Sequence, residues 1–193
     1  MENQEIKDTK KDMKKDINQE SLPQIFMRHP DITNLPSIVL PYGCSLHGHI
    51  ENETENKKWE DLIKKSFERY FSFDELLIKW KGYKPEYVLY LNKDGKEIAT
   101  ASAVESEDYP DEGYIHMVAT MPGYRGLGAV RLIMTAALQS LAVRGFKTAV
   151  LSTDDERLTA IKLYYNLGFR PMYTHESHKE RWEKIFNQLD IKG

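Results

Sequence analysis

The chain contains little cysteine and little net charge. Cys44 is the only cysteine among 193 residues, so the sequence excludes an intrachain disulfide and a thiol-rich metal site. The formal net charge of −3 gives no overall positive field to attract nucleic acid or an anionic membrane. We therefore expect neither of those partners, and the lone cysteine favours a reducing, cytoplasmic location.

Long hydrophobic runs are also missing. No apolar stretch approaches the ~18 residues that a membrane-spanning helix needs. The N-terminal stretch MENQEIKDTKKDMKKD lacks the apolar core of a signal peptide. What is present is an ordinary soluble balance of 40% hydrophobic and 30% charged residues, at a length that suits one domain, with or without a tail.

The composition changes along the chain. Residues 1–20 carry five lysines and six acidic residues with almost nothing to bury, so we expect a charged, disordered tail. Residues 21–43 contain four prolines among apolar residues, which predicts an irregular, extended lead-in. Residues 44–193 show regular hydrophobic periodicity and form the predicted folded domain.

Strand-like and helix-like patterns alternate within the folded part. We predict strands at residues 44–50, on both sides of the hairpin signal NKDG (92–95), and at 114–120, 147–153 and 169–175. We predict helices at residues 57–71, 72–83, 129–145, 154–168 and 178–189, with Ser72 and Glu75 forming a capping box. Early hairpins and later strand–helix alternation predict an α/β (α+β) fold whose central sheet is mixed.

The stretch MPGYRGLGAV (121–130) lies between a predicted strand and a predicted helix. The first backbone N–H groups of a helix have no partners within the helix, and the helix dipole adds to their attraction for an anion. Glycine lets a phosphate oxygen approach the backbone closely. We therefore predict a pyrophosphate cradle made by Arg125, Gly126, Leu127, Gly128, Ala129, Val130 and Arg131, the two arginines adding positive charge.

Other interpretations of this turn remain open. A P-loop needs Lys-Ser/Thr after its last glycine, where this chain has Ala129 and Val130. A dinucleotide fold needs a third glycine, which is missing here. A plain strand-to-helix turn, using glycine only for its dihedral angles, fits the turn equally well when it is taken alone.

A second motif follows the glycine turn at the separation that one known family uses. Residues 125–130 read RGLGAV, and residues 157–169 read RLTAIKLYYNLGF. They resemble, respectively, the Arg/Gln-x-x-Gly-x-Gly/Ala loop and the Asn-x-x-Ala-x-x-Leu-Tyr-x-x-x-Gly-Phe segment of the GNAT superfamily of acyl-CoA-dependent N-acyltransferases. Two positions depart from the pattern: Val130 replaces a small residue, and Arg157 stands where asparagine is frequent.

The resemblance implies a small, bacterial-type, single-domain member with a GNAT-like acyl-CoA N-acyltransferase fold, a mixed central sheet with helices on both faces. It implies transfer of an acetyl group from acetyl-CoA, as co-substrate and without a metal, to a primary amine, expected to belong to a small molecule. The alternative is a catalytically silent acyl-CoA-binding or sensing module, because a fold does not fix a function. The sequence is also compatible with a homodimer.

The resemblance also suggests which residues handle the thioester. The backbone of Val118, Ala119 and Thr120, at the end of the strand before the loop, would polarise the thioester carbonyl. Tyr164 would protonate the leaving thiolate, because the ordinary pKa of a phenol lies above that of a thiol. Tyr165 is the alternative acid.

His116 is the candidate base, with a purely structural histidine as the alternative. It lies two residues before Val118, so alternation along a strand predicts that both side chains point to the same face. The turn before this strand carries residues that could line the acceptor mouth, namely Glu105, Asp108, Tyr109 and Glu112. His175 and His178 have metal-like spacing but lack a third ligand nearby, so we predict no metal site.

Overall fold

A computed structural model describes residues 22–80 and 82–191 of the chain. The predicted tail, residues 1–20, lies outside the described residues. The described chain forms a seven-stranded sheet in the order β2-β3-β4-β5-β6-β1-β7. The neighbouring strands are antiparallel except for β5 and β6, which are parallel, so the predicted mixed sheet is confirmed.

The strands are β1 (Ile25–His29), β2 (Cys44–Gly48), β3 (Val88–Lys93), β4 (Lys96–Glu105), β5 (Gly113–Thr120), β6 (Ala149–Thr153) and β7 (Arg170–Met172). The α-helices are α2 (Glu53–Phe67), α3 (Ala129–Val143), α4 (Leu158–Asn166) and α5 (His178–Leu189). Three short helical turns are η1 (Asp74–Ile78), η2 (Pro85–Tyr87) and η3 (Pro122–Tyr124).

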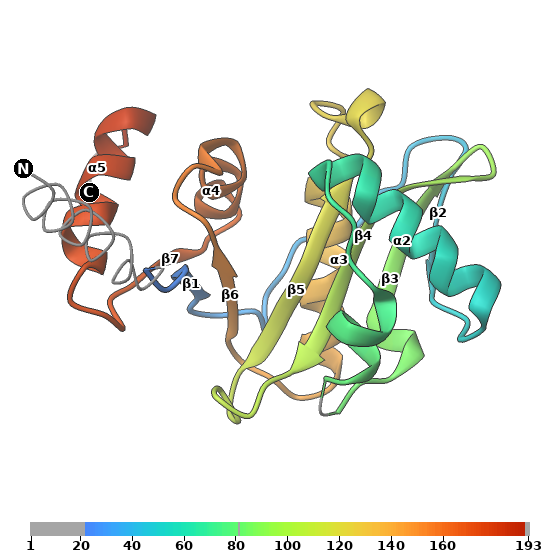
Figure 1. Ribbon diagram of the computed structural model, residues 1–193, viewed down its shortest axis with the longest axis horizontal. Coiled ribbons are helices and arrows are strands. Elements are labelled where there is room, and N and C mark those ends of the chain that lie inside the picture. The colour runs from blue at the N-terminus through green and yellow to red at the C-terminus, as the bar shows by residue number, and fades with distance from the viewer. Residues whose placement is uncertain (1–21, 81, 192–193) are drawn as a thin grey trace, which may run out of the picture.

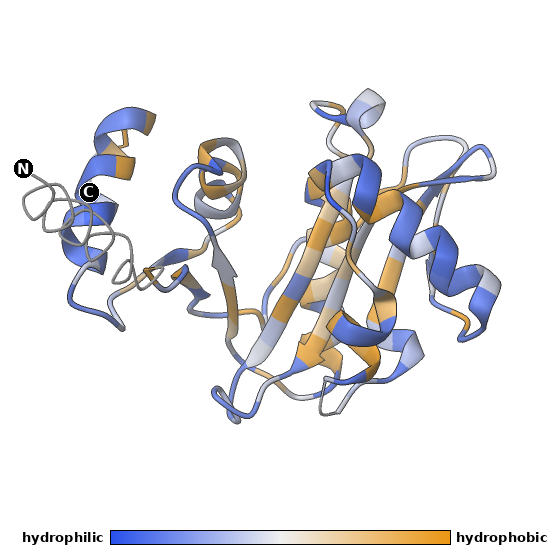
Figure 2. Cartoon of the chain, in the orientation of Figure 1, coloured by the Kyte–Doolittle hydropathy of each residue, from blue (hydrophilic) through white to orange (hydrophobic). Residues whose placement is uncertain are grey.

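Helices cover both faces of the sheet, as predicted. Figure 1 shows α2 in front of β3, β4 and β5, and α3 behind them. The larger core cluster joins α3, α4 and α5 to one face, with Ile133, Ile161 and Trp182 fully buried in it. The smaller cluster packs Trp59 and Ile63 of α2 against the other face. The strands between these layers are largely hydrophobic, whereas α2 and α5 carry hydrophilic outer surfaces (Figure 2).

Several local predictions agree with the structure. Asp94 and Gly95 both have positive φ angles, 51° and 84°, as a two-residue hairpin turn between β3 and β4 requires. Gly145 follows α3 with a φ of 100°, and α5 spans the residues predicted for it. Among the described residues, none of the helices combines the length and the apolar character that crossing a bilayer requires.

The lead-in contains a strand that the sequence analysis did not predict. β1 pairs with β6 and β7 in the sheet, and Ile25 and Met27 are fully buried. Pro23 and Pro30 lie just outside the strand, so they bound it and remove none of its hydrogen-bond donors. The remainder of the lead-in, residues 30–43, contains no regular helix or strand.

The two early helices also differ from their predictions. α2 begins at Glu53, capped by the Asn52 side chain, which accepts a hydrogen bond from the Glu55 N–H. The predicted helix at 72–83 is reduced to the five-residue turn η1, which has no side-chain cap, so the capping box is not formed. The reason is tertiary: Phe73 is fully buried and its N–H donates to Glu60 of α2 at 2.9 Å.

Candidate active site

β5 and β6 separate partway along their length. They pair only at Gly113–Ala149, Tyr114–Val150 and Ile115–Leu151. Beyond Ile115, the described chain offers β5 no strand partner on its β6 side. Figure 1 shows the two strands together at their lower ends and apart above. Residues 116–120 of β5 therefore present a free backbone edge, to which an extended ligand can bind as a strand does.

A bulge in β5 decides which backbone groups face this gap. Met117 has a φ of 50°, rare for a side chain of its size, and the pairing with β4 shifts register there. The Met121 N–H donates to the Ile98 carbonyl of β4 at 2.8 Å. Because alternate residues point to opposite sides, Ala119 also faces β4, whereas the N–H and C=O of Val118 and Thr120 face the gap.

The same bulge corrects one prediction. His116 and Val118 were expected to share a face of the sheet, and this is wrong. Val118 packs against the α3 cluster, whereas the His116 ring lies 4.4 Å from the Trp80 ring on the opposite face. The extra residue at Met117 breaks the two-residue alternation on which the prediction depended.

The glycine turn leads from the free edge into α3. Gly126 and Gly128 have φ angles of 76° and 80°, and a Cβ added to either would contact nothing within 4 Å. Their backbone is therefore uncovered, and their dihedral angles favour glycine. Gly128 caps α3 without a side-chain hydrogen bond, so the first N–H groups of α3 remain available to an anion.

Some of the other residues of the predicted cradle pack in the core, and others are exposed. Val130, the departure from the family pattern, packs against the large core cluster, and Ala129 is buried. Leu127 and Arg131 are exposed. Arg125 donates from Nη2 to the Ser66 carbonyl at 2.8 Å, so its guanidinium joins the glycine turn to the end of α2.

Tyr164 and Tyr165 occupy different surroundings. Tyr164 is 4% exposed and packs in the large core cluster. Burial raises the pKa of its phenol, and the positive charge of Arg157 opposes that shift. Tyr165 is partly buried at the edge of the same cluster, against Phe186 of α5 and under the Arg170 guanidinium.

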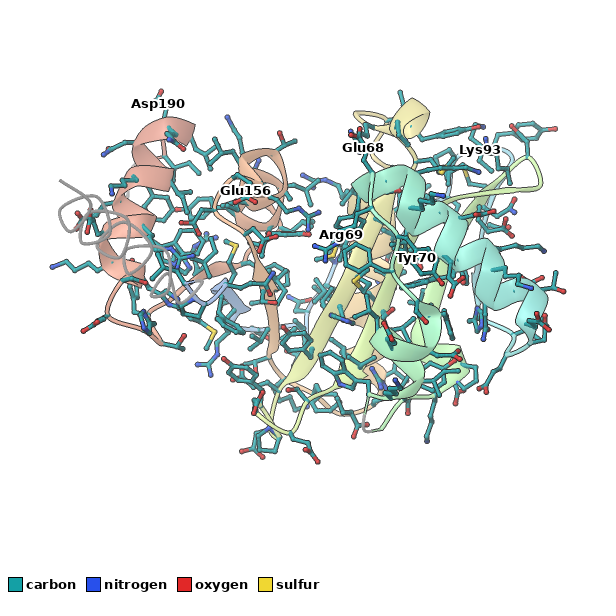
Figure 3. The ribbon with its side chains drawn as sticks, viewed as in Figure 1. Glu68, Arg69, Tyr70, Lys93, Glu156 and Asp190 are labelled. Carbon is teal, nitrogen blue, oxygen red and sulfur yellow. The ribbon has the colours of Figure 1, made fainter. Side chains whose placement is uncertain are left out.

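Arg157 connects the two sides of the gap. Its guanidinium lies 4.7 Å from the Phe67 ring at the end of α2, a distance suited to a cation–π contact. Figure 3 shows Glu156, next to it in sequence, on the α4 side, and Glu68 and Arg69 on the α2 side. Side chains from three segments distant in sequence thus meet where the glycine turn, α2 and the β6–α4 loop approach one another.

His116 is held as a neutral imidazole. Burial lowers its pKa to about 4 from an ordinary 6.5, and a hydrogen bond with the Leu76 backbone opposes the shift. Its Nε2 atom is buried and has no hydrogen-bond partner among the described residues. A neutral imidazole with a free nitrogen can accept a proton.

The four residues predicted to line the acceptor mouth have different surroundings. Glu105 accepts a hydrogen bond from the Trp80 indole through its backbone carbonyl, and Glu112 pairs with Arg28 of β1. Asp108 is exposed. Only Tyr109 adds a ring to the cluster beside His116. No group of three or more His, Cys, Asp or Glu side chains within the described ranges could hold a metal ion.

Three residues of the candidate site were not predicted from the sequence. Trp80, Tyr114 and Phe67 belong to no motif, and each enters the site through a contact with a segment distant in sequence. Aromatic content alone carries no signal for such a role, because most buried rings serve packing.

The site thus combines a mixed sheet that opens between two parallel strands with a glycine turn at the start of a helix. Residues 53–169 match the Acetyltransferase (GNAT) family, and the chain belongs to that family.

Solved structures share the fold. A GCN5-related N-acetyltransferase from Sphaerobacter thermophilus has a TM-score of 0.61 at 20% identity, over 78% of this chain and 50% of that one. The ribosomal-protein-S18-alanine N-acetyltransferase from Escherichia coli has a TM-score of 0.56 at 21% identity, over 67% of this chain and 79% of that one.

A curated relative matches over a shorter stretch. Mycothiol acetyltransferase from Nocardia farcinica is 31% identical over 70 residues, which are 36% of this chain and 23% of that protein. The chain thus matches less than a quarter of this relative's length and half of the Sphaerobacter structure.

Proposed function

We propose that this protein transfers an acetyl group from acetyl-CoA to a primary amine of a small molecule, by direct attack of the amine on the thioester. The observation that carries the proposal is the free edge of β5 at residues 116–120, continuous with the glycine turn that opens α3. A cytoplasmic location is part of the proposal and fits a single, reduced cysteine.

The chain's own groups suit each part of acetyl-CoA. The first N–H groups of α3, with Gly126 and Gly128, would bind the pyrophosphate. The backbone of Val118 and Thr120 would hydrogen-bond the pantetheine arm and polarise the thioester carbonyl. Arg131 adds positive charge at the exposed end of the cradle.

Proton transfer requires a base and an acid. The amine nitrogen attacks the carbonyl carbon, and the C–S bond breaks as the amide forms. His116, neutral at physiological pH, would accept the proton that the nitrogen loses, directly or through a water. Tyr164 would donate its phenolic proton to the departing thiolate.

Calorimetry and a turnover assay test the proposal. We expect purified protein to bind acetyl-CoA and CoA, and to release CoA when a primary amine is added. Binding without CoA release across a broad panel of amines would instead favour the silent acyl-CoA-binding module. The absence of binding to either compound would refute both.

A further inference from the structure

Aromatic side chains gather on the face of the sheet that α2 only partly covers. Phe26, Trp80, Tyr109 and Tyr114 pack with Met172 over the fully buried Val104 and Val150. We call these four rings the aromatic surface. Within the described ranges, α2, α3, α4 and α5 contribute no residue to this cluster.

The aromatic surface adjoins the place where β5 and β6 separate. Tyr114 lies on the paired part of β5, and His116 is the first residue beyond the pairing. The His116 ring is 4.4 Å from the Trp80 ring and 6.2 Å from the Tyr114 ring. Its buried, unpartnered Nε2 therefore lies at the boundary between the rings and the free edge.

The polar groups of two rings already form hydrogen bonds within the protein. The Trp80 indole N–H donates to the Glu105 carbonyl. The Tyr114 hydroxyl donates to Ser152 Oγ at 2.9 Å, and Ser152 Oγ donates to Gln24 at 2.7 Å. These hydrogen bonds orient the two rings. Tyr114 is only 7% exposed, so the half-buried Trp80 and Tyr109 rings offer the surface available to a ligand.

Charged groups of both signs surround the aromatic surface. Arg28 and Glu112, at its edge, form an ion pair with each other. Asp154, beyond Ser152, accepts a hydrogen bond from Gln24 at 2.8 Å. Burial raises the pKa of Tyr109 and Tyr114, and the nearby Asp108 carboxylate adds to that rise, so a negative charge is present to attract a cationic amine. A flat, apolar group matches the rings better than a polycation does.

We propose that the acceptor is a primary amine joined by a short chain to an aromatic ring, which stacks on Trp80 and Tyr109 while the amine reaches the free edge beside His116. This inference deepens the proposed function and rests on it for the reaction. The continuity of the rings with the free edge of β5 identifies the occupant as the acceptor.

A comparison of turnover between different amines tests the proposed class of acceptor. CoA release by the full chain is measured with 2-phenylethylamine, propylamine, spermidine and glucosamine. We expect kcat/KM for 2-phenylethylamine to exceed each of the others by about tenfold or more, the scale of one or two ring contacts. A preference for spermidine, glucosamine or propylamine overturns the proposal and leaves the aromatic surface to another occupant, such as a second protein.

Substitutions test whether the preference for 2-phenylethylamine arises at the aromatic surface. Trp80→Ala and Tyr109→Ala should each lower kcat/KM for 2-phenylethylamine more than for propylamine, and Trp80→Phe should restore part of the ratio. Tyr42→Ala is the matched control, because Tyr42 is 99% exposed and lies outside the cluster. An unchanged ratio in both alanine variants contradicts the proposal.

A binding measurement separates this inference from the proposed function. Saturation-transfer NMR detects contact between 2-phenylethylamine and the full chain without any turnover. If no amine is acetylated but 2-phenylethylamine binds, and Trp80→Ala abolishes the signal, the proposed reaction fails while the surface assignment stands. If 2-phenylethylamine gives no saturation-transfer signal with either the parent protein or Trp80→Ala, the surface assignment fails independently of the reaction.

Discussion

At the scale of single residues, His116 couples the candidate site to stability. Its pKa is about 4 in the folded chain, below the ordinary 6.5 of an exposed histidine. The unfolded chain therefore takes up a proton first as the pH falls. The stability that comes from a neutral His116 is complete above pH 6.5 and is lost progressively between pH 6.5 and pH 4.

We therefore expect His116→Asn to flatten the pH dependence of the unfolding free energy between pH 7 and pH 5. One such histidine gives a slope of at most about 1.4 kcal/mol per pH unit. Urea unfolding at both pH values measures the slope. His29, His49 and His178 also have lowered pKa values, so the difference between variant and parent is the relevant quantity. His47→Asn, at a half-exposed ring, is the control, and equal slopes in all three proteins would contradict the expectation.

Tyr164 gives the second prediction at this scale. Tyr164→Phe should lower kcat by about a hundredfold, the usual scale for losing a general acid, with little change in the Kd for acetyl-CoA. Tyr165→Phe is the matched control, because Tyr165 lies against α5. Stopped-flow rates and calorimetry measure the two quantities. Equal losses in kcat and in the affinity for acetyl-CoA would contradict the role of Tyr164 as a general acid.

At the scale of elements, the strand–turn–helix unit of β5, the glycine turn and α3 carries the proposed cradle. Gly128 and Gly145 lie at opposite ends of α3, both with positive φ and open surroundings. Alanine at either position has the same unfavourable backbone conformation, but only Gly128 lies in the proposed cradle. A comparison of substitutions at the two glycines therefore separates the effect of backbone strain from the effect on ligand binding.

We expect Gly128→Ala and Gly145→Ala each to cost about 1 kcal/mol of stability, because alanine disfavours a positive φ. Only Gly128→Ala should weaken CoA binding, by about tenfold or more, since its Cβ would stand where a phosphate approaches the backbone. Thermal unfolding and calorimetry measure the two effects. Unaltered CoA affinity in Gly128→Ala would indicate a plain turn.

At the scale of the whole molecule, Arg181 joins three distant segments. From α5 it makes two hydrogen bonds to the Asp155 carboxylate, at 2.7 and 2.6 Å, and one to the Pro23 carbonyl at 2.8 Å. Asp155 precedes α4, and Pro23 precedes β1. The Arg181 side chain is 12% exposed, so this ion pair is better shielded from solvent than the surface pairs on the helices.

We expect Arg181→Met to lower the unfolding free energy by about 1–2 kcal/mol, because two-pronged, charge-assisted hydrogen bonds are among the stronger ones. Lys184→Met breaks an exposed pair on the same helix and should have no measurable effect. Urea denaturation compares the two. Equal stability of both variants would show that α5 is held by its apolar face alone, through Trp182 and Ile185.

Much of the fold was predictable because its signals are local. The turn at Asp94–Gly95, the glycines after α3 and α4, and the amphipathic pattern of α5 depend on neighbouring residues only. The two motifs that identified the family also lie within short segments. The predicted cradle and Tyr164 came from these segments.

Tertiary contacts decided the rest. β1 is a strand because Phe26 pairs with Ser152 and Met172, which no local pattern specifies. The bulge at Met117 turns Val118 away from the face on which His116 meets Trp80, and α2 supplies the carbonyl that binds Arg125. The sequence by itself determined turns, amphipathic helices and the family, because short-range sterics and periodicity encode them. Only the tertiary structure decided the free edge and the aromatic surface, because both depend on which distant segments meet.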